Sequence, residues 1–291
     1  MAKGHTIDYG DADGAEGAAR PVVRDIRFHD LTTALAKGFD DFKAVPTHLI
    51  FLFLIYPFVM LILSRVAARQ DLLPLVFPLF AGYTLVGPMI AIGMYELSRR
   101  RELGLDTSRK HLFDVLKSRS LGAIVGLGLV LAVIYFIWLM TALAIYKMTF
   151  GSGLPDSVVA LIVQLVSFDL STTGPQSIEQ FAVQVITTKA GWTLILVGSG
   201  VGLVFSIIVL SVSAVSFPML LDRRVSAWAA AQTSIRAVLA NPVSMGLWGI
   251  IVAVTLAVGT LTLFVGLAIV LPVLGHATWH LYRSLVEHSP T

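Results

Sequence analysis

The chain of 291 residues is 56% hydrophobic and only 13% charged, with a mean hydropathy of +0.82. A soluble domain carries roughly 25% charged residues, so this is the composition of a membrane protein. The chain has no cysteine and a net charge of +3. The lack of cysteine excludes disulfides, thiolate metal ligands, iron–sulfur clusters and cysteine nucleophiles.

The chain begins with a polar stretch, residues 1–29, that is acidic and rich in Gly and Ala. It contains no apolar run of signal-peptide length. Such a composition is typical of a segment without a packed core. We therefore expect a flexible cytoplasmic tail over 1–29, followed by a single polytopic membrane domain over 30–288.

An amphipathic helix is predicted by DLTTALAKGFDDFKAVP, which precedes the first long apolar run. Leu31, Leu35, Phe39 and Phe42 share its apolar face, and Asp30 is placed to cap its first turn. DTSRKHLFDVLKSRS and SAWAAAQTSIRAVLANP precede two later apolar runs in the same way. We expect these helices to lie in the headgroup layer; the alternative is that they are ordered loops.

Six apolar runs can cross a bilayer, for which a helix needs about 20 residues. The last two result from dividing 243–282, which is too long for one span, near its least apolar point at 258–262. The sequence thus predicts an all-α membrane protein with six transmembrane helices. They form three units, each an amphipathic helix followed by a hairpin of two spans. The predicted spans are 47–66, 72–98, 119–146, 191–220, 243–260 and 262–282.

The basic residues predict the orientation of these spans. Six spans place all but four of the 21 Lys and Arg residues on the side that holds both termini. Cytoplasmic loops retain Lys and Arg, so we expect both termini in the cytoplasm. The four exceptions are Arg65, Arg69, Lys147 and Lys189.

The segment 148–190, between the third and fourth spans, is the largest external feature. Within it, 155–168 is apolar but too short to span, and 175–191 is amphipathic. Two interfacial helices or a partly re-entrant pair fit these lengths. We expect this insertion to be an external contact surface.

Two histidines near the end of the last span are the first candidate site. His276 and His280 lie four residues apart, a spacing at which two imidazoles share a helix face and can bind one metal ion or a haem. A complete site needs further ligands. Glu96 takes the place of His280 when PMIAIGMYELSR is aligned with PVLGHATWHLYR, and His48 starts the first span.

The alternative interpretation of the same stretch is structural. Trp279, His280, Tyr282 and Arg283 are amphipathic side chains at a predicted membrane edge, where they anchor a helix at headgroup depth or form structural hydrogen bonds. We favour this interpretation and expect no catalytic, cofactor or metal site. His276, His280 and Glu96 stay as the only metal-ligand candidates.

A stripe of small residues follows one side of span 191–220, and GAIVG at 122–126 resembles it. Such residues allow close helix packing, which we favour, or line a water path. No ionisable side chain lies near the middle of a predicted span, which disfavours an ion-coupled carrier. The stripe consists of Ser199, Gly202, Ser206, Ser213 and Ser216.

Three stretches carry a resemblance to a known family: GPMIAIGMYELSRRRE, SFPMLLDRR with SIRAVLANPVSMGLWGI, and LPVLGHATWHLYR. Here the chain resembles predicted integral membrane proteins of unknown function from alphaproteobacteria, some of which are labelled as cytochrome c oxidase subunits. The resemblance covers roughly 30–287. It implies a multi-pass protein of a bacterial inner (plasma) membrane, and it supplies no catalytic residues.

Three functions remain open. The favoured one is a non-catalytic accessory or assembly subunit of a membrane complex, with a respiratory oxidase suggested by the resemblance. Its partners would be the lipid bilayer and larger membrane proteins, without nucleic acid and without a cofactor. The second is a small uncoupled channel or permease, and the third is an enzyme or haem protein acting through Glu96, His276 and His280.

Overall fold

The computed structural model describes residues 21–45, 47, 55, 59, 78–79, 91–150, 163 and 178–287. In this part of the chain all named elements are helices, and an isolated antiparallel bridge joins Val23 to Val286. Most of spans 47–66 and 72–98 lies outside the described residues, as do His48 and almost all of 155–168.

The first helix, α1, covers Phe28–Ala44 and starts two residues earlier than expected. Asp30 therefore lies inside its first turn, where its carboxylate accepts a hydrogen bond of 2.7 Å from the backbone N–H of Arg27. It stabilises the start of the helix from the third helical position instead of capping it directly.

The buried face of α1 also differs from the predicted one. Leu31, Ala34, Gly38 and Asp41 are buried, whereas Phe39 is 48% exposed. The reason is close approach: a Cβ placed on Gly38 would lie 2.5 Å from the backbone nitrogen of Ala277. The face with small residues can reach another backbone, and the face with bulky residues cannot.

The remaining elements follow in chain order. They are α4 (Ile92–Glu102), the 3₁₀ helix η2 (Arg109–Lys117), α5 (Leu121–Phe150), α7 (Ile178–Thr187), α8 (Lys189–Ser213), α9 (Ser216–Asp222), α10 (Ala227–Ala240), α11 (Pro242–Leu261) and α12 (Leu267–Leu285). The second predicted amphipathic helix is thus η2, a 3₁₀ helix. The third is α10, whose cap is Ser226, with its hydroxyl 3.1 Å from the N–H of Ala229.

Three of the predicted spans are confirmed as helices that are long and apolar enough to cross a membrane: Leu121–Phe150, Lys189–Asp222 and Pro242–Leu261. The division of 243–282 is confirmed too, since α11 ends at Leu261 and α12 starts at Leu267. Leu263 and Phe264 turn the chain there with φ values of 54° and 65°. Helix α12 replaces the predicted span 262–282 and is not among the three apolar helices.

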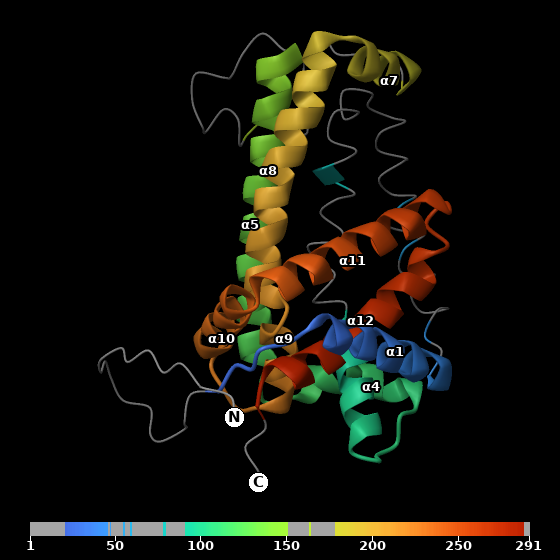
Figure 1. Ribbon diagram of the computed structural model, residues 1–291, viewed down its shortest axis with the longest axis vertical. Coiled ribbons are helices and arrows are strands. Elements are labelled where there is room, and N and C mark those ends of the chain that lie inside the picture. The colour runs from blue at the N-terminus through green and yellow to red at the C-terminus, as the bar shows by residue number, and fades with distance from the viewer. Residues whose placement is uncertain are drawn as a thin grey trace, which may run out of the picture.

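Figure 1 shows two differently built regions. In the first, which we call the hairpin, α5 and α8 run side by side and α7 extends sideways from the upper end of α8. In the second, the base, α12 lies between α1 and α4, with η2, α9 and α10 beside them. Helix α11 leaves the base obliquely. The base contains most of the large buried side chains, among them Phe217, Trp279 and Tyr282.

The two ends of the described chain are joined across the base. The backbone N–H of Arg24 donates to Leu285 (2.8 Å), and that of Glu287 donates to Val22 (3.0 Å). Asn241, at the junction of α10 and α11, accepts from the N–H of Ile26 at 2.8 Å. The part of the expected tail from Val22 to Ile26 is therefore paired with distant segments of the chain. Residues 1–20 lie outside the described part of the chain.

Candidate functional site

The two histidines of α12 both point into the base, where they contact different helices. His276 is 1% exposed, and its Nδ1 lies 2.7 Å from the hydroxyl of Ser98 in α4. One turn later, Nε2 of His280 lies 2.8 Å from Oδ2 of Asp41 in α1. The shared helix face that the sequence predicts is present, and it is used to contact two neighbouring helices.

Asp41 is the centre of this group of polar side chains. Its Oδ2 is 2.5 Å from the hydroxyl of Ser98, and its Oδ1 is 2.5 Å from a guanidinium nitrogen of Arg101. The carboxylate is only 8% exposed. We call Asp41, Ser98, Arg101, His276 and His280 the Asp41 cluster. It joins α1, α4 and α12 through one carboxylate.

The surroundings of Asp41 favour its ionised form. Burial raises the pKa of its carboxyl, but hydrogen bonds from His280 and Ser98 and the nearby imidazoles lower it by more, so the pKa lies below the usual value. The buried charge is therefore compensated by donors from two other helices, which is the condition for a stable buried carboxylate.

The hydrogen bonds also specify the protonation of His276. A distance of 2.5 Å is typical of a hydroxyl that donates to a carboxylate, so the single hydroxyl proton of Ser98 goes to Asp41. Nδ1 of His276 must then donate to the Ser98 oxygen. In a neutral imidazole Nε2 is then the unprotonated nitrogen, buried and without a hydrogen-bond partner among the described residues.

The order of these groups argues against nucleophilic catalysis. In a Ser-His-Asp triad the imidazole lies between the hydroxyl and the carboxylate and removes the hydroxyl proton. Here the hydroxyl of Ser98 lies between the carboxylate and the imidazole, and Ser98 is only 1% exposed. The arrangement orients three helices and presents no accessible nucleophile.

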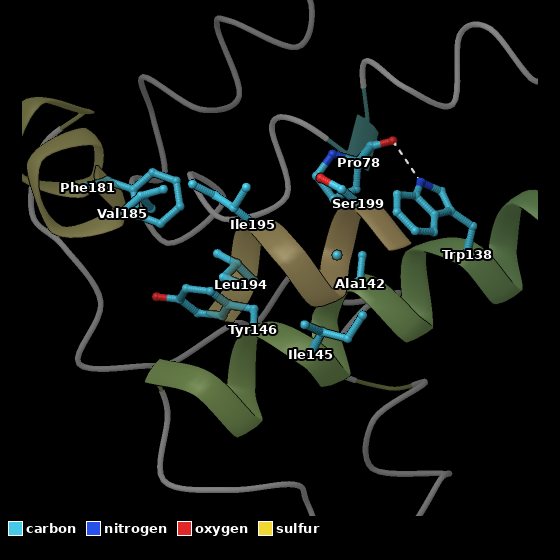
Figure 2. Close-up of a pocket in the computed structure, with 11 residues that line it drawn as sticks. Pro78, Trp138, Ala142, Ile145, Tyr146, Phe181, Val185, Leu194, Ile195 and Ser199 are labelled. Atoms are coloured by element: carbon cyan, nitrogen blue, oxygen red, sulfur yellow. Dashed lines mark hydrogen bonds between the residues drawn. The ribbon is translucent and has the colours of Figure 1, made fainter. Parts of the chain in front are cut away.

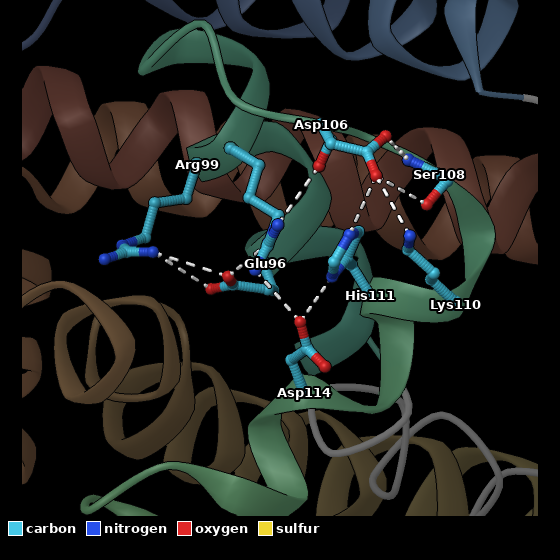
Figure 3. A network of polar contacts seen from close by, with 8 residues as sticks. Glu96, Arg99, Asp106, Ser108, Lys110, His111 and Asp114 are labelled. Carbon is cyan, nitrogen blue, oxygen red and sulfur yellow. Dashed lines mark hydrogen bonds and ion pairs between the residues drawn. The ribbon is translucent and has the colours of Figure 1, made fainter.

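The third metal-ligand candidate, Glu96, belongs to a different network. Its carboxylate lies 2.9 Å from Nε of Arg100 and 3.3 Å from a guanidinium nitrogen of Arg99. Figure 3 shows the pairing of Glu96 with Arg99. The structure thus brings His276 and His280 into one cluster and gives Glu96 two arginine partners. Across the described ranges no group of three or more His, Cys, Asp or Glu residues is placed to hold a metal ion.

This second network fastens η2 to α4. Arg100 also reaches Asp114 at 2.9 Å, and His111 lies between Asp114 (2.5 Å) and Asp106 (3.0 Å). The hydrogen bond with His111 lowers the pKa of Asp114. The backbone N–H of Ser108, followed by His111, lowers the pKa of Asp106. Both carboxylates are accessible to solvent, so their ion pairs add little stability individually.

The prediction that the end of α12 forms an interfacial belt is wrong about its surroundings, because the aromatic side chains are buried in the base. Trp279 and Tyr282 are 1% and 0% exposed. The indole N–H of Trp279 donates to Glu102 at 3.0 Å, and the hydroxyl of Tyr282 donates to Asp222 at 2.6 Å. Arg283 also binds Glu102, at 2.6 Å. The polar tips meet carboxylates of other helices, so the hydrogen-bonding part of that interpretation describes them correctly.

The small-residue stripe of α8 has mixed surroundings. At its lower end Ser213 and Ser216 are buried in the base, and a Cβ placed on Gly202 would lie 3.3 Å from the indole of Trp138 in α5. Ser206 is exposed and donates to the carbonyl of Gly202 in its own helix. Close packing is thus present at three positions of the stripe. In GAIVG, by contrast, Gly122 and Gly126 have open space beside them.

Sequence patterns do not identify the residues that complete the cluster. They place Asp41 away from the apolar face of α1, and they give no signal for Ser98 and Arg101. A usable pattern is nevertheless present in α1. Leu31, Ala34, Gly38 and Asp41 repeat at intervals of three and four, a spacing that puts them on one helix face.

Comparison with known proteins places the chain in a family. A search of curated proteins and a search of solved structures each returned no match. Two overlapping segments, 76–170 and 157–222, match one family, and together they cover half of the chain, including α4, α5 and α8. These segments carry two of the three long apolar helices. The chain belongs to the family described as Predicted integral membrane protein (DUF2189).

Proposed function

We propose that the protein is a non-catalytic accessory or assembly subunit of a larger complex in a bacterial inner membrane. It crosses the membrane six times, with both ends in the cytoplasm. The pairing of Val23 with Val286 supports an even number of crossings, because it holds both ends of the described chain on one side. The arginines in the last turn of α4 and the two that follow α9 lie in the same base, in accord with the retention of Lys and Arg in the cytoplasm.

The observation that carries the proposal is the unpacked apolar surface of α8. In its most apolar stretch only 6% of the residues are buried, against 33% in α5. Leu196, Leu203 and Ile207 are each more than half exposed. A span that served only its own bundle would bury one face against several neighbours. Helix α8 instead offers a long apolar face that a partner helix can cover.

The Asp41 cluster supports a non-catalytic role. Its donors and acceptors are engaged mainly with each other and hold α1 and α4 against α12. An active site keeps reactive groups accessible to a substrate, whereas Asp41, Ser98 and His276 are almost entirely buried. We therefore assign the cluster to the architecture of the base.

Photo-crosslinking in native membranes tests this proposal without disturbing the fold. A photoreactive side chain at Leu203 in α8 is compared with one at Val254 in α11, another exposed apolar position on a long apolar helix. We expect protein adducts at Leu203 and lipid adducts at Val254. Mass spectrometry of the adducts identifies the partner, with respiratory oxidase subunits as the first to be sought. Lipid adducts alone at both positions would overturn the docking of a partner on α8.

The alternative function, a small uncoupled channel, draws on the hydroxyls of α8 that face outward. Ser199 and Ser206 are exposed on the same helix. Several copies of α8 facing one another would bring these hydroxyls to a shared path. Flux of small solutes into liposomes that is lost in Ser206→Leu would favour this alternative. Absence of flux, or flux that survives in that variant, counts against it.

A further inference from the structure

An apolar cavity of about 330 Å³ lies between side chains of α5, α7 and α8, at the end of the hairpin where α7 joins α8. Figure 2 shows its wall: Trp138 and Tyr146 come from α5, Phe181 comes from α7, and Ile195 and Ser199 come from α8. Pro78 completes one side, and its carbonyl accepts a hydrogen bond from the indole N–H of Trp138 at 3.4 Å.

The lining decides what can occupy this space. A buried water needs two to four polar partners. Three of the lining side chains bear polar atoms, Trp138, Tyr146 and Ser199, and the indole N–H of Trp138 already donates to Pro78. The cavity has roughly twice the volume of an engineered ~150 Å³ apolar cavity that stays dry and binds benzene. It is therefore suited to a hydrocarbon and unsuited to water.

The location identifies the kind of hydrocarbon. Both α5 and α8 are long, apolar helices that can cross a membrane, and the cavity is partly open. The medium next to such helices consists of lipid tails. We propose that the cavity binds one acyl chain of a membrane phospholipid, inserted between α5 and α8 beneath α7. The bound chain fills the space between the three helices and fixes α7 on the hairpin.

Trp138 provides a direct probe of this site. Its side chain is 4% exposed, so it is shielded from the bulk lipid and faces the cavity with one edge. Bromine atoms on an acyl chain quench indole fluorescence on contact. We would reconstitute the full chain in phosphatidylcholine–phosphatidylglycerol vesicles containing a rising fraction of phospholipid with brominated chains. The contribution of Trp138 is the part of the quenching that disappears in Trp138→Phe.

Two glycines of α8 supply a matched pair of variants. Gly198 lines the cavity and Gly200 is exposed two residues later, and both have open space beside the position of a Cβ. Leucine is a better helix former than glycine, so neither substitution should prevent folding. Gly198→Leu fills the cavity with a side chain of the protein itself, whereas Gly200→Leu adds the same side chain outside.

Because Trp138 is shielded from the bulk lipid, a brominated chain quenches it only after entering the cavity. We expect quenching of Trp138 in the wild type to rise with the fraction of brominated phospholipid. Gly198→Leu should reduce this quenching by at least about tenfold, because its side chain displaces the buried methylenes of the acyl chain. Gly200→Leu should behave as the wild type. Equal quenching of Trp138 in the wild type and Gly198→Leu, or no quenching of Trp138 in the wild type, would overturn the proposal. Saturable quenching by a brominated free fatty acid but not by phospholipid would overturn the phospholipid as the source.

Discussion

Helices α12 and α8 belong to the same chain and have opposite surroundings. Eleven of the 19 residues of α12 are buried, against three of the 25 residues of α8. In α12 the polar side chains of His276, Trp279 and His280 find their partners on other helices. In α8 the hydroxyl of Ser206 bonds to its own backbone. Polar contacts between helices hold the base together. The hairpin instead exposes apolar surface that lipid or a partner must cover.

This difference follows from the medium around each region. A lone polar group exposed to hydrocarbon has no water to bind and must be satisfied within its own helix. A polar group buried between helices can instead be satisfied by a neighbour, and it then joins the two. Substitutions in the base should therefore weaken contacts between helices, whereas equivalent substitutions in the hairpin should have little effect.

The largest effect is expected for Asp41→Ala, because Arg101, Ser98 and His280 all lose their shared acceptor. Removing one partner of a buried ion pair costs about 3–5 kcal/mol. The measurement is denaturant unfolding of the detergent-solubilised protein. Asp40→Ala is the matched control on the same helix: Asp40 forms an exposed pair with Lys43, and its loss should cost about 0–1 kcal/mol. Equal effects of the two substitutions would show that the Asp41 cluster does not hold the base together.

Glycine substitutions compare the packing of the two regions. Gly38→Ala places a methyl group 2.5 Å from the backbone of Ala277, so α1 must move away from α12. We expect destabilisation of about 1–3 kcal/mol, the usual cost of overpacking. Gly122→Ala in α5 has open space and should be neutral or slightly stabilising. Thermal unfolding of both variants measures the contrast, and a neutral Gly38→Ala would disprove the close contact of α1 with α12.

The stability of the base should depend on pH through the ionisation of Asp41. Because the pKa of Asp41 is lowered in the fold, its contribution is complete above the usual carboxyl pKa of about 3.9 and is lost as pH falls through the folded value. The stability difference between the wild type and Asp41→Asn should therefore be constant from neutral pH down to about pH 5 and shrink below about pH 4. Unfolding curves at each pH give this difference. A difference that shrinks between pH 7 and pH 5 would contradict the lowered pKa.

The smallest effect concerns the turn between α11 and α12. Leu263 has a φ of 54° and is 79% exposed, so a residue with a side chain adopts a conformation that glycine adopts more easily. Leu263→Gly should stabilise the protein by up to about 1 kcal/mol. Leu261→Gly, an exposed change inside the end of α11, should destabilise it by a similar amount. A loss of stability in Leu263→Gly would contradict the left-handed turn.

The predictions from sequence succeeded where one helix determines the outcome. Runs of apolar residues identified α5, α8 and α11, and the length of 243–282 predicted that it is divided in two. The turn itself follows Leu261 and so lies slightly later than the predicted 258–262. They were only partly right at α1, where Leu31 is buried as predicted but Phe39 is exposed and Gly38 is buried instead. The apolar pattern identifies residues that avoid water, but small residues determine how closely one backbone can approach another.

The sequence predicted the two histidines of the candidate site but not their partners. The spacing of His276 and His280 shows that they share a face, and this holds in the structure. Their partner Asp41 is more than 200 positions away and lies on a helix whose composition is that of a solvated surface. The residue types of Trp279 and Tyr282 fit two environments equally well. Their polar tips can meet lipid headgroups or, as here, the carboxylates of Glu102 and Asp222. Local pattern cannot distinguish these cases.

Hydropathy, the length of apolar runs and the positions of Lys and Arg specify by themselves that this chain is a helical membrane protein, since the transfer of side chains to lipid depends on each segment alone. Only the tertiary structure places Asp41 between two histidines, a serine and an arginine, pairs Val23 with Val286, and leaves a cavity beside Trp138. Those features depend on which distant helices meet. The shapes of the packed helix surfaces and the hydrogen bonding of buried polar groups determine which helices do.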